Sequence, residues 1–128
     1  LISECLKRKI ELIVCGGAGG RIDPTQVFAA DLMHTKRDKL LKTLRQKLRK
    51  DFAINTHGRE IGIKAVYSSE LPVYPTAAGG VCRKPEINSY GLDCKGGMGS
   101  ASFVTGAFGF AAAAIAVAKV RDKAIAIN

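Results

Sequence analysis

The feature that most constrains the fold is a short apolar run that ends in a glycine-rich stretch. Residues 10–15 are almost continuously apolar and are followed by Gly16-Gly17-Ala18-Gly19-Gly20. A short apolar run without polar alternation is typical of a strand that is covered on both faces, as in the parallel sheet of an α/β protein. We therefore predict an α/β fold in which this strand is interior.

The glycine stretch does not complete either common phosphate-binding motif. When G-x-G-x-x-G starts at Gly17, its third glycine falls at Ile22, and no Lys-Ser or Lys-Thr follows as a Walker motif requires. We interpret the stretch as a close-approach turn, at which a ligand or another chain could come near the backbone. We place five residues at the rim of a substrate pocket: Gly17, Gly19, Gly20, Arg21 and Asp23.

Helical and strand patterns alternate along the rest of the first half. We expect the last turns of a helix over 1–8, a strand over 26–30, a helix over 35–52 and a half-covered strand over 61–67. Thr35 and Asp38 fit a capping box for the helix over 35–52. An apolar stripe along this helix is expected from Leu40, Leu41, Leu44, Leu48 and Phe52.

The second half of the chain has two unusual segments. Three prolines and several glycines interrupt every periodic pattern over 70–98, which predicts a long irregular loop. No residue over 96–118 is charged, and Ala and Gly dominate there. This composition favours a buried or subunit-interface helix over a membrane span, because small residues permit close helix packing and contribute little transfer energy.

Basic residues are concentrated in one segment. The chain has 20 Lys and Arg against 11 Asp and Glu, and eight of the basic residues lie within 36–50, where Asp38 is the only acid. Such a row of cations suits an RNA phosphate backbone; a merely solvated face and a membrane-surface helix are the alternatives. The candidate nucleic-acid contacts are Lys36, Arg37, Lys42, Arg45, Lys47, Arg49 and Lys50.

The cysteines and histidines give no metal-ligand pattern. The four cysteines include no C-x-x-C pair, so we expect no metal site. Cys5 and Cys15 fit core positions. Cys94 is followed by Lys95 and two glycines, which favours a thiolate, and it is the candidate catalytic residue; a small buried thiol is the alternative.

Six short segments, in order along nearly the whole chain, resemble the tRNA threonylcarbamoyladenosine dehydratases. This family belongs to the superfamily of ubiquitin-activating-like adenylating enzymes, with the thiamine and molybdopterin sulfur-carrier adenylyltransferases. The segments are GGAGGRIDPTQ (16–26), DL (31–32), KLRKDF (47–52), VYSSE (66–70), VYP (73–75) and LDCKGGMGSA (92–101).

The resemblance implies an activity and a set of partners. It implies an enzyme that uses ATP with Mg²⁺ to adenylate the carboxylate of threonylcarbamoyladenosine in tRNA and then closes the side chain to a ring. It further implies a homodimer in the cytoplasm, tRNA but not DNA as partner, no membrane association and a sulfur-transfer or sulfur-acceptor protein as a further partner. Related enzymes use a cysteine in a crossing loop, for which Cys94 or Cys82 is the candidate.

The ATP-binding glycine motif of this family lies upstream of every segment matched here. We therefore expect residues 1–128 to form a single domain that is the C-terminal half of a Rossmann-like adenylating-enzyme fold. It should have a mixed sheet, a basic amphipathic helix and an Ala/Gly-rich C-terminal helix, no cofactor-binding residue, and no activity alone. The alternatives are half of a sulfur-carrier or ubiquitin-like protein adenylyltransferase, and a non-enzymatic basic RNA-binding module.

Overall fold

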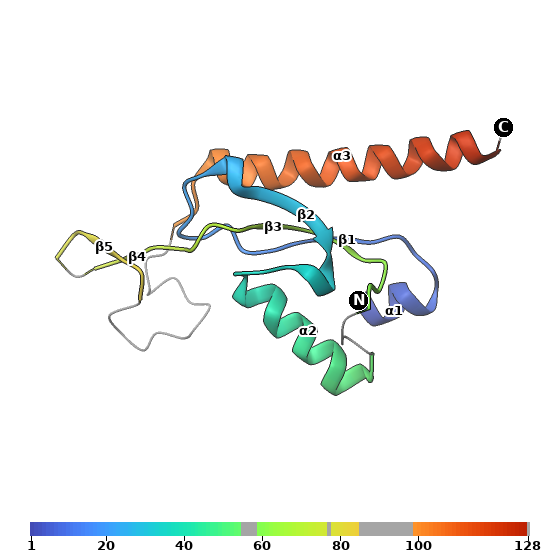
Figure 1. Cartoon of the computed structure of the whole chain (residues 1–128), viewed down its shortest axis with the longest axis horizontal. Helices are drawn as coiled ribbons and strands as arrows, with labels where there is room; N and C mark the ends of the chain where they lie inside the picture. Colours follow the sequence, from blue (N-terminus) through green and yellow to red (C-terminus); the bar gives the residue numbers. More distant parts are fainter. Residues whose placement is uncertain (55–58, 77, 85–98, 128) are drawn as a thin grey trace.

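The computed structural model describes residues 1–54, 59–76, 78–84 and 99–127. Figure 1 shows its elements, which are α1 (Ile2–Lys7), β1 (Ile13–Cys15), η1 (Pro24–Gln26), β2 (Val27–Asp31), η2 (Leu32–His34), α2 (Lys39–Phe52), β3 (Lys64–Ser68), β4 (Tyr74–Pro75), β5 (Val81–Cys82) and α3 (Ser102–Ile127). The helices and strands expected over the first half of the chain are present; α1, β1, α2 and β3 are shorter than expected, and β2 is shifted by one residue.

A three-stranded mixed sheet forms the centre of the molecule. Its strand order is β1-β3-β2, with β1 parallel and β2 antiparallel to β3. Helices α2 and α3 cover its opposite faces (Figure 1). The predicted α/β fold with a mixed sheet is therefore confirmed.

Strand β3 is buried on both faces, so the predicted half-covered strand is wrong. Ala65 packs with Leu41 and Leu48 in the core on the α2 side, whereas Val66 packs with Val104 and Phe108 on the α3 side. Consecutive strand residues point to opposite faces of a sheet, so these neighbours serve two separate cores. A central strand between two helical layers needs apolar residues at both sets of positions.

Helix α2 begins later than the predicted helix over 35–52. Its N-cap is Asp38, whose side chain accepts from the Leu41 N–H. Thr35 lies outside the helix and donates its hydroxyl to the Leu32 carbonyl, so the predicted capping box is wrong. An aspartate is itself a favoured N-cap and needs no partner at position 35.

The apolar stripe of α2 is narrower than predicted. Leu41 and Leu48 are buried and Leu44 packs against the core, whereas Leu40 and Phe52 are half exposed. The buried leucines alone follow the seven-residue spacing that brings a helix back to the same side.

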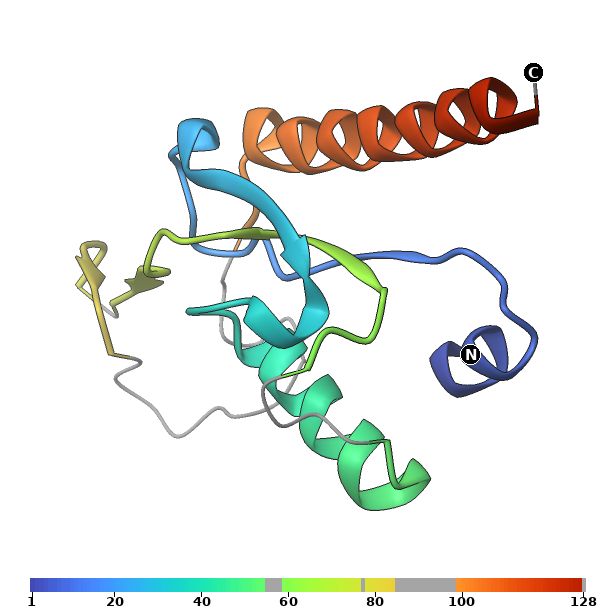
Figure 2. The ribbon, with the colours of Figure 1, turned by 45° about the vertical axis from the view of Figure 1, so that its right-hand side comes forward.

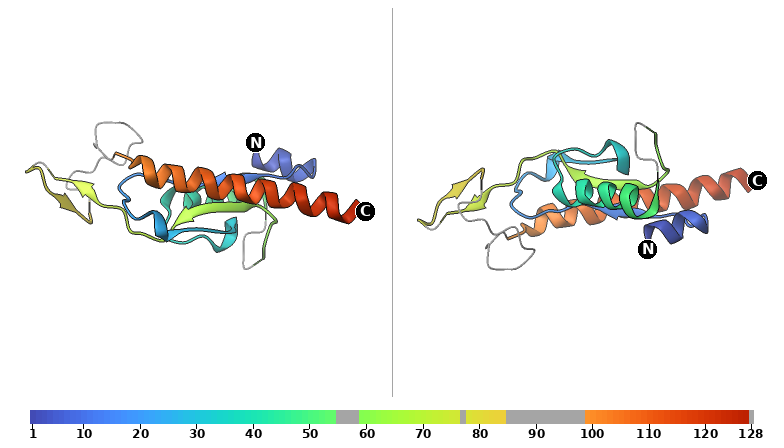
Figure 3. Two further views of the ribbon diagram at one scale, coloured as in Figure 1. Left: turned by 90° about the horizontal axis from the view of Figure 1, so that it is seen from above. Right: turned by 90° about the horizontal axis from the view of Figure 1, so that it is seen from below.

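Helix α3 is only partly covered in the single chain. Of the two predicted placements, burial within the chain is therefore wrong for most of its length, and a position at a subunit interface stays a prediction. Val104 and Phe108 are buried against the sheet, and the helix then continues past it toward the C-terminus (Figures 1 and 3). The segment Ser102–Ala126 is long and apolar enough to cross a membrane, and only 11% of its most apolar window is buried. Phe110, at 80% exposure, is typical of the uncovered side.

A small antiparallel hairpin, β4–β5, lies within the range predicted to be an irregular loop. Tyr74 pairs with Cys82 and Pro75 with Val81. The hairpin projects from the end of the molecule at which α3 begins (Figures 1 and 2). The remainder of that range, 85–98, lies outside the described residues, and so does the candidate catalytic residue Cys94.

Candidate nucleic-acid interface

Six of the seven predicted nucleic-acid contacts are exposed. On α2, Lys50 lies opposite Leu41 and Leu48, and the other three lie on the flanks of the helix between these two sides. Among the described residues, none of the six has an ion-pair partner, so their positive charge is uncompensated. The six residues, called here the basic face, are Lys36, Arg37, Lys42, Lys47, Arg49 and Lys50.

Arg45, the seventh predicted contact, is placed differently. Its side chain is half-buried, and its Nη1 donates to the Leu32 carbonyl at 3.2 Å and to the Thr35 hydroxyl. These bonds tie α2 to the 3₁₀ turn η2. Arg45 therefore supports the position of α2, and we leave it out of the basic face.

The glycine stretch receives a carboxylate of the same chain. The Gly17 N–H donates to Asp38 Oδ2 at 2.9 Å, while Asp38 Oδ1 caps α2. A Cβ at position 16 would stand 2.1 Å from Asp38 Oδ2, far inside any allowed contact. The predicted close-approach turn is confirmed, but the group that approaches Gly16 is the α2 cap of the same chain and not a ligand or another chain.

Arg21 is buried behind the turn. Its side chain is 4% exposed and lies 3.9 Å from Asp38 Oδ2 through Nη2. Its Nε donates to the Glu70 carbonyl at 3.1 Å, its Nη2 to the Arg37 carbonyl at 3.0 Å, and its Nη1 to the Gly17 carbonyl. One guanidinium thus joins the glycine turn, the segment before α2 and the segment after β3, which excludes direct contact with a large substrate.

The other predicted rim residues shape the turn. The Asp23 carboxylate accepts from the Thr25 hydroxyl, the Gln26 amide and the Thr25 N–H, and these bonds lower the pKa of Asp23. Gly20 has φ +70°, which favours glycine, and its N–H and carbonyl bond to residues 99 and 73. Gly19 lies between these anchored positions. These residues hold the turn in place.

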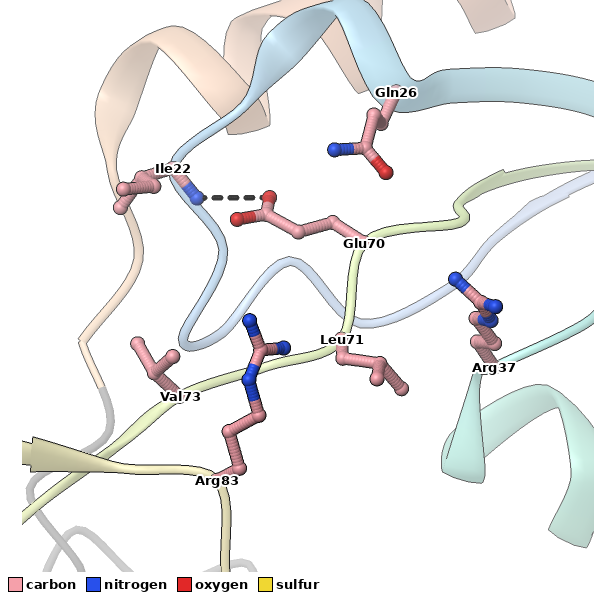
Figure 4. A pocket seen from close by; sticks show the side chains of 7 residues that line it. All are labelled: Ile22, Gln26, Arg37, Glu70, Leu71, Val73 and Arg83. Carbon is pink, nitrogen blue, oxygen red and sulfur yellow. Dashed lines mark hydrogen bonds between the residues drawn. The ribbon is translucent and has the colours of Figure 1, made fainter.

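A pocket of about 370 Å³ lies next to this turn and contains none of the predicted rim residues in its lining (Figure 4). The Glu70 carboxylate anchors its edge, because Oε2 accepts from the Ile22 N–H at 3.0 Å and from the Asp23 N–H at 2.9 Å. The lining residues are Ile22, Gln26, Arg37, Glu70, Leu71, Val73 and Arg83. Sequence reasoning missed Glu70 and Arg83, although Glu70 lies in the VYSSE segment of the family resemblance.

Two of the described cysteines, Cys5 and Cys15, were predicted to lie in the core. Cys5 is buried, as predicted for a core position, whereas Cys15 is exposed and so is not the predicted core residue. Partial desolvation raises the pKa of the Cys15 thiol, which favours its protonated form. Within residues 1–54, 59–76, 78–84 and 99–127, no three His, Cys, Asp or Glu side chains gather as metal ligands would.

No family model matches the chain, but relatives and solved structures do. The tRNA threonylcarbamoyladenosine dehydratase of Escherichia coli is 41% identical over 97% of this chain and 47% of its own length. That of Haemophilus influenzae is 39% identical over 96% of this chain and 44% of its own length.

Two solved structures have the same fold over nearly all of this chain. TcdA (CsdL) superposes with a TM-score of 0.83 and 39% identity, covering 98% of this chain and 45% of that one. The E. coli tRNA N6-threonylcarbamoyladenosine dehydratase in complex with ATP gives a TM-score of 0.78 and 37% identity, covering 100% and 44%.

The mixed sheet between α2 and α3 therefore belongs to the class of ThiF-like adenylating-enzyme folds. Along nearly its whole length the chain is similar to tRNA threonylcarbamoyladenosine dehydratases, which confirms the resemblance seen in its sequence. It spans about half the length of the curated relatives that it matches.

Proposed function

We propose that this chain is the tRNA-contacting part of an ATP-dependent enzyme that cyclises threonylcarbamoyladenosine in tRNA by dehydration. The observation that carries the proposal is the 41% identity to such a dehydratase along 97% of the chain. The reaction belongs to the whole protein, in which ATP with Mg²⁺ would supply the activation of the substrate carboxylate.

The glycine turn of this chain does not fit an ATP phosphate. Its Gly17 N–H already donates to the Asp38 carboxylate, and a phosphate at the same place would meet that negative charge. A side chain also fills the space in front of Gly16. We therefore assign no ATP-binding step to the glycine turn.

The role of this chain in the reaction is to bind and orient tRNA. The basic face presents six unpaired cations, and each phosphate that it neutralises releases counterions and strengthens binding. Asp38 caps α2, and Arg45 fastens the helix to η2, so the cations are carried on a fixed element. Rigid placement reduces the entropy lost when tRNA binds.

The activity is tested with a full-length protein that contains this chain, ATP, Mg²⁺ and tRNA carrying threonylcarbamoyladenosine. Mass spectrometry of the digested tRNA should show the modified nucleoside converted to a species lighter by one water. This chain alone should bind the tRNA without converting it. Adenylation of a small protein with a Gly-Gly tail in place of tRNA would instead support the sulfur-carrier alternative, and tRNA binding without conversion by the full-length protein would support an RNA-binding module.

Three further parts of the proposal concern assembly and location. A homodimer is supported by the exposed apolar residues of α3, among them Phe103, Phe110 and Val117, which a second subunit would cover. Sedimentation of the full-length protein should give twice the monomer mass. A sulfur-transfer or sulfur-acceptor protein as a further partner and a location in the cytoplasm are proposed from the family resemblance alone.

A further inference from the structure

The pocket beside the glycine turn is open to solvent and is lined by charged as well as apolar residues. Its volume of about 370 Å³ lies between the segments before and at the end of η1, the segment before α2, the segment after β3 and Arg83 (Figure 4). Ligand pockets of this volume take groups the size of a nucleotide. Of the residues that line the pocket, Arg37 alone belongs to the basic face.

Two arginines give this pocket an excess of positive charge. The Glu70 carboxylate is engaged with backbone N–H groups and turns toward Ile22 (Figure 4). Arg37 uses one N–H donor, from Nη1 to the Ser69 carbonyl at 3.1 Å. Arg83 is exposed, and within the described part of the chain no residue bonds to its side chain. Most guanidinium donors in the pocket are therefore open to an anion.

The buried Arg21 holds the two charged walls of the pocket from behind. It donates to the main-chain carbonyls of both Arg37 and Glu70. Arg37 has φ +55°, a conformation that is costly for a residue with a side chain and persists when its surroundings fix it. The bond from Arg21 supplies that constraint, so the Arg37 side chain leaves the backbone in a defined direction.

The other walls of the pocket are apolar and accessible. Ile22 and Leu71 are 67% and 45% exposed, and Val73 is half-buried. Beyond them Lys39 lies 5.5 Å from the centre of the Tyr74 ring and donates to its hydroxyl, which extends the positive surface from the pocket to the start of α2. A ligand that suits these walls has an anionic group joined to a flat or apolar body.

We propose that this pocket binds one nucleotide of tRNA, with its phosphate between Arg37 and Arg83 and its ribose or base against Leu71. A guanidinium group can donate two parallel hydrogen bonds to two phosphate oxygens, which fixes the position of the phosphate as well as adding affinity. The pocket then fixes the register of the tRNA, whereas the basic face supplies attraction that does not depend on position. This inference rests on the proposed tRNA binding.

The test measures binding of a fluorescent tRNA transcript by anisotropy over a series of salt concentrations. The double variant Arg37→Ala/Arg83→Ala should bind about tenfold more weakly, with the slope of log affinity against log salt reduced by about 1, because one phosphate contact is lost. Arg59→Ala removes one exposed charge outside the pocket and should leave the slope unchanged. Arg37→Lys/Arg83→Lys should retain the slope, since lysine keeps the charge.

Arg83→Ala alone is the variant least able to disturb folding, because no described residue depends on that side chain. Equal slopes for wild type, Arg83→Ala and the double variant would overturn the pocket proposal while leaving the proposed tRNA binding intact. A wild-type chain whose tRNA binding is independent of salt would overturn the proposed function itself. Competition by excess ATP against tRNA in wild type, lost in the double variant, would assign the pocket to a free nucleotide and contradict the proposal.

Discussion

Helices α2 and α3 cover opposite faces of one sheet and differ in what they leave to the solvent. Helix α2 buries Leu41 and Leu48 and exposes unpaired cations, whereas α3 buries Val104 and Phe108 and exposes further phenylalanines and valines. A charged exposed face is stable in water and attracts a polyanion. An apolar exposed face is the kind that proteins cover with a partner, because contiguous apolar surface is rarely left bare.

The two helices are similar in how they pack on the sheet and differ in what their exposed sides can bind. The part of α2 that packs is short, yet the helix is fixed at its start by Asp38 and along its length by Arg45. Past Phe108, α3 still packs through Ala111, Ala112 and Ile115, and farther along Lys119 and Lys123 form ion pairs with Glu11. We expect a substitution at the start of α2 to lower the free energy of unfolding strongly, and substitutions in α3 to lower it only where the side chain is buried.

The largest expected effect is that of Asp38→Ala. This change removes the cap of α2, leaves the Gly17 N–H without its acceptor and leaves Arg21 as a buried charge without its carboxylate. Breaking a buried pair in this way costs about 3–5 kcal/mol of unfolding free energy. Urea denaturation followed by circular dichroism measures it. The control, Asp51→Ala, removes an exposed acid from the same helix and should change stability by less than about 0.5 kcal/mol.

A smaller effect is expected on α3, where two phenylalanines form a matched pair. Phe108→Ala removes a side chain that is 4% exposed and should lower the unfolding free energy by about 3 kcal/mol. Phe110→Ala removes one that is 80% exposed and should be close to neutral in the monomeric chain. Equal losses for both variants, measured by urea denaturation at low protein concentration, would show that the outer face of α3 is covered in the chain itself.

The smallest effect concerns the ion pairs that join α3 to the segment before β1. The hydrogen bond and charge of Lys119, with a further contribution from Lys123, lower the pKa of Glu11 from its ordinary value of 4.5. A lowered folded-state pKa stabilises the protein above the unfolded value, and this stabilisation is lost as pH falls through the folded value. Glu11→Gln should therefore lower the thermal midpoint slightly at pH 7 and not at about pH 2. A loss of equal size at both pH values would contradict the ion-pair explanation.

Local patterns in the sequence predicted the elements but not their contacts. The apolar run before the glycines became β1, which pairs in parallel with β3. Its predicted interior position is not found among the described strands, because β1 lies at the edge of the three-stranded sheet and Cys15 is exposed. The glycine turn was correctly predicted as a close approach, because only glycine tolerates an atom where a Cβ would stand. That the atom is an oxygen of Asp38 depends on a tertiary contact, for which a single sequence carries no signal.

For the candidate site, too, the sequence predicted local features but not tertiary contacts. Charge density predicted the exposed cations of α2, since a helix with two buried leucines must turn its lysines outward. It gave no sign that Arg45 is half-buried, and the glycine stretch gave none that Arg21 is buried. A charged side chain that donates to main-chain carbonyls looks the same in sequence as a free one. Arg83 was missed because the hairpin that carries it to the pocket lies in a range without periodicity.

The most direct test of the central claim is the salt dependence of tRNA binding when the basic face is neutralised. The triple variant Lys42→Gln/Arg49→Gln/Lys50→Gln should bind a tRNA transcript about a hundredfold more weakly and reduce the slope of log affinity against log salt by about 2–3. The control removes three exposed basic residues elsewhere, Lys7, Lys9 and Arg59, and should leave the slope near that of wild type. Equal slopes for both triple variants would contradict the assignment of the basic face of α2 to tRNA.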